Sequence, residues 1–161
     1  MKMNDHNQAI IQSFVYHLRE NEHKLAVCLN KINQDELWQS PYKGVVSIGH
    51  QTQHLMGNMR QWILHGVCGD ADVRNRPLEF TESSDTSAGL ISQLSALIDE
   101  VELKLSRIED ADLLKVVDVQ GYVFTGTGKI IHVNEHVSYH VGQIVLLIKR
   151  LGYTVDFYPH V

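Results

Sequence analysis

Histidines spaced four residues apart are the part of the sequence whose chemistry is easiest to interpret. The run His132-Val-Asn-Glu-His136-Val-Ser-Tyr-His140 holds three of them, and the pair His50 and His54 repeats the spacing earlier in the chain. Residues four apart lie almost above one another on a helix, so two imidazoles can point at one ion. A catalytic Zn²⁺ site needs three protein ligands and an open fourth position. Two histidines from one helix and one from another would meet that need.

We expect His54, His136 and His140 to bind a divalent metal. The stripe that begins with His136 and His140 becomes apolar one turn later, and His54 borders an apolar face, so these rings should face the interior of a helical protein. The apolar residues behind this inference are Leu55, Met59, Trp62, Ile144, Leu147, Ile148 and Leu151. Zn²⁺ is the first candidate and Ni²⁺ the second, because imidazole suits both. His50 and His132 are weaker ligand candidates, for which a hydrogen-bonded structural role is the favoured alternative.

Groups that could act on a substrate are harder to identify, and the sequence leaves the catalytic residues unknown. Glu135 could be a base or a partner of His136, or a plain surface carboxylate. Arg60 could bind an anionic substrate or be solvated. Cys68 could approach the site, although packing as a small apolar residue in a loop is the simpler interpretation.

Two other chemistries fit the sequence poorly. A di-iron bundle needs two Glu-x-x-His motifs, and Glu20 with His23 supplies only one. The run Phe124-Thr-Gly-Thr-Gly-Lys129 suggests a phosphate-binding loop. However, Val123 occupies the place of its first glycine, and Ile130 that of the Ser or Thr that binds Mg²⁺. The di-iron chemistry therefore fits less well than the three-histidine site, and we exclude the phosphate-binding loop.

Four amphipathic helices must position these groups, because apolar residues recur with helical period in four segments. The predicted helices cover residues 5–32, 47–66, 88–108 and 128–152. Residues 66–87 form a connection of a length that is usually functional or mobile in compact domains. Residues 113–128 suggest extended structure or a small hairpin. The economical architecture is an all-α four-helix bundle, with a small extended segment before its last helix, in one domain over residues 1–161.

Composition and charge exclude several classes of function. The 161-residue chain has a net charge of -5 and no cluster of Lys and Arg, so we expect no nucleic-acid partner. Its longest aliphatic run, residues 144–148, is far shorter than the about 20 residues that span a bilayer, so we expect no membrane association. The first residues lack the apolar core of a secretory signal, and the two cysteines follow no zinc-finger or redox spacing. We expect a cytoplasmic protein with reduced thiols.

Four sequence blocks resemble the DinB/YfiT-like superfamily, most closely its DUF1572 branch. The blocks are His54-Leu-Met-Gly-Asn-Met-Arg-Gln-Trp-Ile63, Val73-Arg-Asn-Arg-Pro-Leu-Glu-Phe80, Val119-Gln-Gly-Tyr122 and Glu135-His-Val-Ser-Tyr-His-Val-Gly-Gln-Ile144. The resemblance extends from about Ser47 to Leu151 and rests on the order and spacing of these blocks.

This resemblance implies a four-helix bundle of up-down-down-up connectivity that holds a divalent metal. The implied ligands are one histidine of the second long helix and two from an HxxxH motif of the last, which are His54, His136 and His140 here. Members of the superfamily often form homodimers. Relatives include thiol-dependent S-transferases and a thiol-dependent maleylpyruvate isomerase. The resemblance therefore implies a homodimer with a small-molecule substrate, and a low-molecular-weight thiol as one option for the co-substrate.

Three functions from different classes stay open at this point. A metal-dependent enzyme would use the three-histidine metal as a Lewis acid for thiol transfer or hydrolysis. A non-catalytic, stress-related dimer that binds a metal or ligand would hold the ion in closed coordination, with His50, His132 or Cys68 as the fourth ligand. In a helical interaction module without metal, the histidines would form a hydrogen-bonded polar layer.

Overall fold

Each of the four long helices begins after a residue whose side chain caps it. The computed structural model describes residues 3–81 and 83–158. The long helices are α1 (Asp5–Leu29), α3 (Ile48–Met59), α4 (Ser87–Leu105) and α6 (Gly126–Arg150). The capping side chains, which accept a hydrogen bond from the backbone N–H three residues later, are those of Asn4, Ser47, Thr86 and Thr125. Short polar side chains at these positions satisfy N–H groups that the first turn of a helix leaves unpaired.

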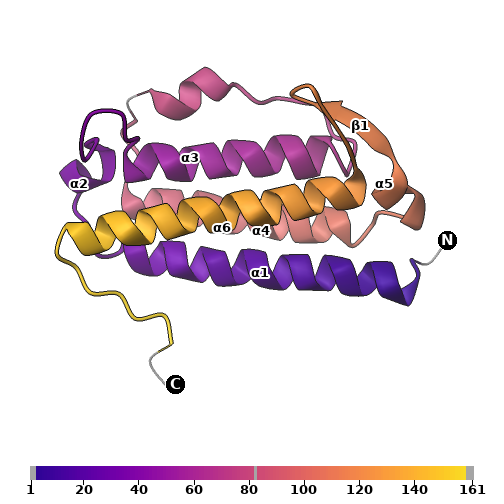
Figure 1. Ribbon diagram of the computed structural model, residues 1–161, viewed down its shortest axis with the longest axis horizontal. Helices are drawn as coiled ribbons and strands as arrows, with labels where there is room; N and C mark the ends of the chain where they lie inside the picture. The colour runs from indigo at the N-terminus through magenta and orange to yellow at the C-terminus, as the bar shows by residue number, and fades with distance from the viewer. Residues whose placement is uncertain (1–2, 82, 159–161) are drawn as a thin grey trace.

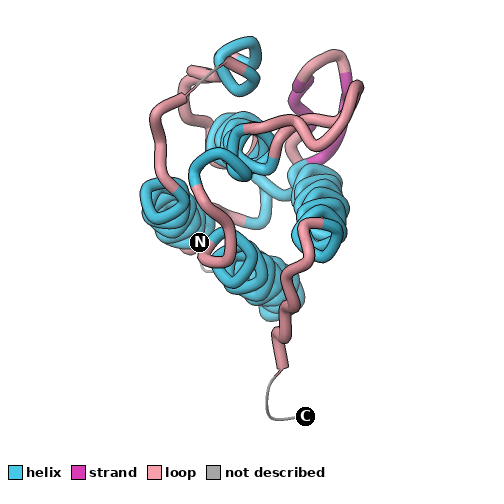
Figure 2. The backbone as a smooth tube through the Cα atoms, turned by 90° about the vertical axis from the view of Figure 1, so that its left-hand side faces the viewer, coloured by secondary structure: helices cyan, strands magenta, loops and turns pink. Residues whose placement is uncertain are grey.

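The four helices form a bundle of up-down-down-up connectivity, as predicted (Figure 1). α3 and α4 run in the same direction, opposite to α1 and α6, because a long connection returns along the bundle between α3 and α4. α1 and α3 each contact both α4 and α6, and they lie across the bundle from each other (Figure 2). The arrangement therefore places α3 beside α6, although the two helices are far apart in the sequence.

The second predicted helix ends in a turn of unusual geometry. α3 continues into η1 (Arg60–His65), a π-helix in which the N–H of Gly66 bonds to the carbonyl of Gln61, five residues back. Trp62, Ile63 and Leu64 of this wider turn are all buried. The predicted helix over residues 47–66 is thus confirmed in extent, but its last turn is not α-helical.

The long connection between α3 and α4 lies against the outer side of α3. It contains η2 (Arg76–Phe80), a short 3-10 helix with a proline in its first turn. η2 contacts α3 and lies outside the bundle (Figure 2). A helix of the bundle is thus covered on its outer face by a segment for which the sequence indicated no regular structure.

Three smaller elements complete the fold. The short helices α2 (Gln34–Trp38) and α5 (Asp110–Leu114) were not predicted, because one or two turns are too short to show an apolar period. The predicted extended segment is an antiparallel hairpin of β1 (Val116–Val119) and β2 (Tyr122–Thr125). Its turn residues Gln120 and Gly121 have φ values of 58° and 82°, the left-handed values of a type I′ turn.

The histidines of α6 lie beside the core stripe of this helix and not within it. The buried apolar residues of α6 are Ile130, Val133, Val137, Val141, Ile144, Leu147 and Ile148. His132, His136 and His140 each precede a buried valine by one residue, which places them about 100° around the helix. They are half-buried at the seam with α3, so the expectation that they face the bundle interior was only partly right. Leu151, which was expected in the core, follows the end of α6 and is 43% exposed.

The bundle helices are amphipathic. α4, for example, buries Leu90, Leu94 and Leu97 on one side and exposes Asp99 and Glu102 on the other. Within residues 3–81 and 83–158, no helix combines the length and the apolar character that crossing a bilayer would need.

Candidate metal centre

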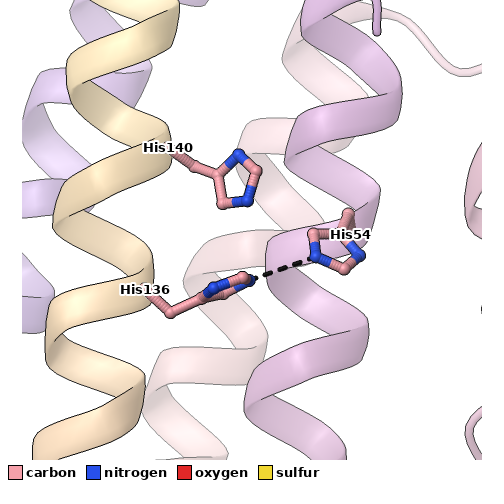
Figure 3. Close-up of side chains that lie close together, drawn as sticks. All are labelled: His54, His136 and His140. Carbon is pink, nitrogen blue, oxygen red and sulfur yellow. Dashed lines mark hydrogen bonds between the residues drawn. The ribbon is translucent and has the colours of Figure 1, made fainter.

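His54 of α3 and His136 and His140 of α6 point toward one another across the seam between the two helices (Figure 3). One ring nitrogen of each lies within 4.8 Å of the other two. His54 Nε2 and His136 Nε2 are 3.1 Å apart. The three ring centroids are separated by 4.7 to 5.3 Å. The structure thus brings together the three residues that the sequence analysis predicted as metal ligands.

A buried carboxylate from the long connection contacts His54 on the opposite side of its ring. His54 Nδ1 lies 2.8 Å from Glu79 Oε2. Arg74 binds the same carboxylate twice, through Nε to Oε1 at 2.6 Å and through Nη2 to Oε2 at 2.9 Å. Glu79 is 7% exposed and the side chain of Arg74 is 3% exposed. The connection between α3 and α4 therefore places a buried ion pair against the side of the His54 ring that faces away from His136.

Gln51, almost one helical turn before His54, contacts His140. Its amide nitrogen donates a hydrogen bond to the carbonyl of Val46 at 3.0 Å, and its Oε1 lies 3.3 Å from His140 Nδ1. Because the amide oxygen can only accept, Nδ1 of His140 carries the hydrogen in this contact. The lone pair of His140 then lies on Nε2.

Burial keeps all three imidazoles neutral. Burial, together with charge repulsion from the neighbouring His140 and His54, lowers the pKa of His136 to about 3. Burial likewise lowers the pKa of His140 to about 4, with His54 acting in the same direction. The pKa of His54 is also lowered by burial, although its hydrogen bond with Glu79 opposes the shift. At neutral pH each ring therefore keeps an unprotonated nitrogen.

These three imidazoles fit a divalent metal ion of the kind that binds to histidine nitrogen. Metal binding requires neutral imidazoles, which the site supplies without loss of protons at neutral pH. Nε2 atoms as close as those of His54 and His136 must have a hydrogen or a cation between them. Within residues 3–81 and 83–158, no further His, Cys, Asp or Glu joins this group. Three histidines could thus hold an ion and leave coordination positions free.

Comparison with known proteins identifies the family. Residues 5–155, nearly the whole chain, match the family described as "Protein of unknown function (DUF1572)". The chain belongs to the DUF1572 family. No curated protein matches it in sequence. The family resemblance that the sequence blocks indicated is therefore confirmed.

Solved structures of DinB-like proteins and of YfiT share the fold of this DUF1572 protein. A DinB-like protein of Bacillus subtilis, YjoA, is 19% identical, with a TM-score of 0.70 over 91% of this chain and 96% of that one. A DinB-like protein of Bacillus cereus is 17% identical, with a TM-score of 0.73 over 97% and 98%. YfiT of Bacillus subtilis, described as a probable metal-dependent hydrolase with an unusual four-helix bundle topology, is 15% identical, with a TM-score of 0.72 over 89% of each chain. At these identities the likeness establishes a common fold.

The two weaker histidine candidates lie in other environments. Both ring nitrogens of His50 face oxygen atoms, Nδ1 the hydroxyl of Ser47 at 2.7 Å and Nε2 the carbonyl of Thr81 at 2.9 Å. His132 packs on Trp62, with ring centroids 4.2 Å apart, and burial lowers its pKa. Neither residue joins the group formed by the three other rings. The structure thus gives His50 a hydrogen-bonding role and His132 an aromatic packing role.

The other candidate residues are not brought to the three histidines. Arg60 is on the surface, where its guanidinium lies 3.4 Å from the carboxylate of Glu100 on α4. Glu135 is exposed on α6. Cys68 is half-buried, and burial, assisted by the negative charge of Asp70, raises the pKa of its thiol to about 12. A thiol with this pKa is not activated for metal binding or nucleophilic attack at neutral pH.

Sequence reasoning missed the residues that contact the candidate ligands on the sides of their rings that face away from the cluster. Gln51 could have been found, because it precedes His54 by three residues and so shares its side of the helix. Arg74 and Glu79 belong to a sequence block that supported the family resemblance, but no periodic pattern assigns their side chains a direction. Only the path of the connection over α3 brings them to His54.

Proposed function

We propose that this protein is a metal-dependent enzyme whose metal is held by His54, His136 and His140. The convergence of three neutral imidazoles, with one ring nitrogen of each within 4.8 Å of the others, carries this proposal. A divalent ion bound there would supply Lewis acidity, which lowers the pKa of a coordinated water or thiol. Zn²⁺ is our first candidate and Ni²⁺ our second, because both accept imidazole nitrogen.

The residues of the chain have distinct tasks in such a site. His54 and the pair on α6 approach from two helices, so the bundle itself fixes their separation. Gln51 sets the tautomer of His140 through its hydrogen bond to Nδ1. Phe80, whose ring centroid lies 5.4 Å from that of His54, packs against one side of that imidazole.

A pocket beside His140 supports a small-molecule substrate. It has a volume of about 370 Å³ and is lined by, among others, Tyr42, Val46, Gln51, Tyr139 and Leu146. Most of this lining is apolar and two amides contribute polarity, so the pocket suits a small, largely uncharged organic group. Hydrolysis is our first candidate reaction, because the similar structure of YfiT is described as that of a probable metal-dependent hydrolase. Transfer of a low-molecular-weight thiol is the second.

Metal analysis of purified protein tests the site. We expect about one Zn²⁺ or Ni²⁺ per chain in the wild type and almost none in His136→Gln, because two histidines are too few for a stable catalytic-type site. His17→Gln, which changes an exposed histidine, is the matched control and should keep its metal. Equal occupancy in wild type and His136→Gln, whether high or near zero, would contradict the proposal.

Catalysis needs a separate measurement. Hydrolysis of a panel of small esters and amides should fall when the metal is removed by a chelator and return on addition of Zn²⁺ or Ni²⁺. If the wild type is fully loaded but shows no activity that depends on the metal against such substrates or against thiol acceptors, a non-catalytic metal-binding role is correct instead.

A further inference from the structure

Glu79 contacts His54 in a way that determines which ring nitrogen carries the hydrogen. Nδ1 of His54 has two polar neighbours, Glu79 Oε2 at 2.8 Å and Arg74 Nη2 at 3.2 Å. A guanidinium can only donate, so the hydrogen of Nδ1 must go to the carboxylate. Arg74 Nη2 in turn donates to Glu79 Oε2 at 2.9 Å. His54 is therefore held with its hydrogen on Nδ1 and its lone pair on Nε2, the atom that faces His136.

Arg74 fixes the carboxylate that does this. Its guanidinium binds both oxygens of Glu79 in a bidentate pair, at 2.6 and 2.9 Å, and both side chains are almost fully buried. Bidentate pairs of this kind restrict orientation as well as distance. Arg74 also donates to Gln61 Oε1 at 3.0 Å, which ties the connection to η1. We call residues 72–80, which carry both charges, the strap.

A glycine in α3 makes the room that Glu79 occupies. A side chain at Gly57, three residues after His54, would overlap the Glu79 carboxylate and crowd Arg74 Nε. Glycine is among the poorest helix formers, so its place inside α3 calls for a packing reason. Close approach of the strap to α3 supplies that reason.

We propose that Glu79 is the positioning residue of His54: its hydrogen bond to Nδ1 leaves the lone pair of Nε2 free to bind the metal. Arg74 holds the Glu79 carboxylate in place, and the absence of a side chain at Gly57 leaves room for it. This inference rests on the proposed metal site and adds a residue outside the three ligands. Carboxylates that accept a hydrogen bond from a metal-binding histidine fix its tautomer and raise its basicity, and their loss typically costs about 10- to 100-fold in metal affinity. Metal affinity should therefore depend on whether the strap is docked on α3.

Glu79→Gln tests the proposal in two ways. In metal-free protein, imidazole ¹⁵N and ¹³C NMR should show the hydrogen of His54 on Nδ1 in the wild type, and a loss of that preference in the variant. In competition with a coloured chelator, the affinity for Zn²⁺ should fall by about 10- to 100-fold. Glu100→Gln, which removes an exposed carboxylate paired with Arg60, is the control and should change neither measurement.

Two further variants show whether a loss of Zn²⁺ affinity comes from the lost positioning of His54 or from the buried, unpaired charge that Glu79→Gln leaves on Arg74. Arg74→Met combined with Glu79→Gln removes both members of the buried pair, so no unpaired charge remains, and we expect Zn²⁺ affinity to stay low. Gly57→Ala keeps both charges but displaces the carboxylate, and should lower the affinity as well. Recovery of wild-type affinity in the double variant would mean that the loss came from the stranded arginine, and would overturn the proposal.

The outcomes also distinguish this inference from the proposed metal site. If the wild type binds no Zn²⁺, the metal site is wrong, while the NMR of metal-free protein still reports whether Glu79 orients His54. If the wild type binds Zn²⁺ and Glu79→Gln leaves both the affinity and the tautomer unchanged, Glu79 only forms a structural ion pair and the inference fails.

Discussion

His136 and His140 are two bases placed where a positive charge is costly. Burial is the main reason, and the closeness of the three rings adds repulsion among any that would be protonated. A folded protein that holds such groups neutral gives up the protons that its unfolded chain would bind. The same property that favours metal binding thus makes stability depend on pH.

For metal-free protein we predict a loss of stability in mild acid. The pKa of both rings is lowered from the ordinary 6.5, to about 3 for His136 and about 4 for His140. Below pH 6.5 the unfolded chain therefore binds protons that the folded one does not, so the free energy of unfolding should fall as the pH drops from 6.5 toward about 4. Well above pH 6.5, where the unfolded chain also holds both rings neutral, these groups should contribute no slope.

Urea denaturation at a series of pH values, in the presence of a chelator, measures this slope. The double variant His136→Gln/His140→Gln should show a flatter dependence between pH 6.5 and 4, because glutamine does not titrate. Identical slopes in variant and wild type would show that the two rings are not the source of the acid sensitivity.

At the scale of elements, glycines in α6 show how closely its neighbours approach. A side chain at Gly126, the first residue of α6, would overlap the carbonyl oxygen of Asp112 and the Cα of Leu113 in α5. Both are backbone atoms, which cannot move aside without shifting α5. Gly142 in the same helix is exposed and has no heavy atom near the position of a side chain. The two glycines therefore have opposite consequences for packing.

We predict opposite effects for alanine at these two positions. Gly126→Ala should destabilise the protein by about 1–3 kcal/mol, the usual cost of overpacking. Gly142→Ala should stabilise it by about 0.5–1 kcal/mol, because alanine is the better residue inside a helix and meets nothing there. Urea denaturation of both variants measures the difference. A stabilising Gly126→Ala would show that α5 does not pack on the start of α6 as described.

At the scale of the whole molecule, a metal at the three histidines would join α3 to α6. These two helices are separated in sequence by the connection, α4, α5 and the hairpin. An ion that bridges them binds the folded bundle and finds no equivalent site in the unfolded chain. Binding should therefore stabilise the entire domain and not the site alone.

We predict that Zn²⁺ raises the melting temperature of metal-free protein. At a free concentration of about 100 times its Kd, binding adds about 2.7 kcal/mol of stability. For a domain of this size that corresponds to about 5–11 °C. Differential scanning fluorimetry at increasing Zn²⁺ concentration measures the shift, and His136→Gln should show little of it. A melting temperature that does not respond to chelator or to Zn²⁺ would support a polar histidine layer without metal.

The sequence by itself determined the bundle and the three histidines. Helical period fixes which residues share a side of one helix, so the spacing of His136 and His140 was enough to pair them. The family resemblance implied the connectivity and the same three candidate ligands, including His54. Ser47, where the second predicted helix begins, caps α3 for the same local reason, whereas α6 begins at Gly126, two residues before the predicted start.

Only the tertiary structure decided how the site is built around those histidines. The histidines of α6 each precede a buried valine by one residue and so lie next to the core stripe of the helix. They face the seam with α3, and the position of that seam depends on where α3 packs and not on the apolar period of α6. Glu79 and Arg74 come from a connection without period, so their directions depend on how that segment packs over Gly57 of α3. Contacts between segments distant in the chain are set by packing, and local sequence patterns do not encode them.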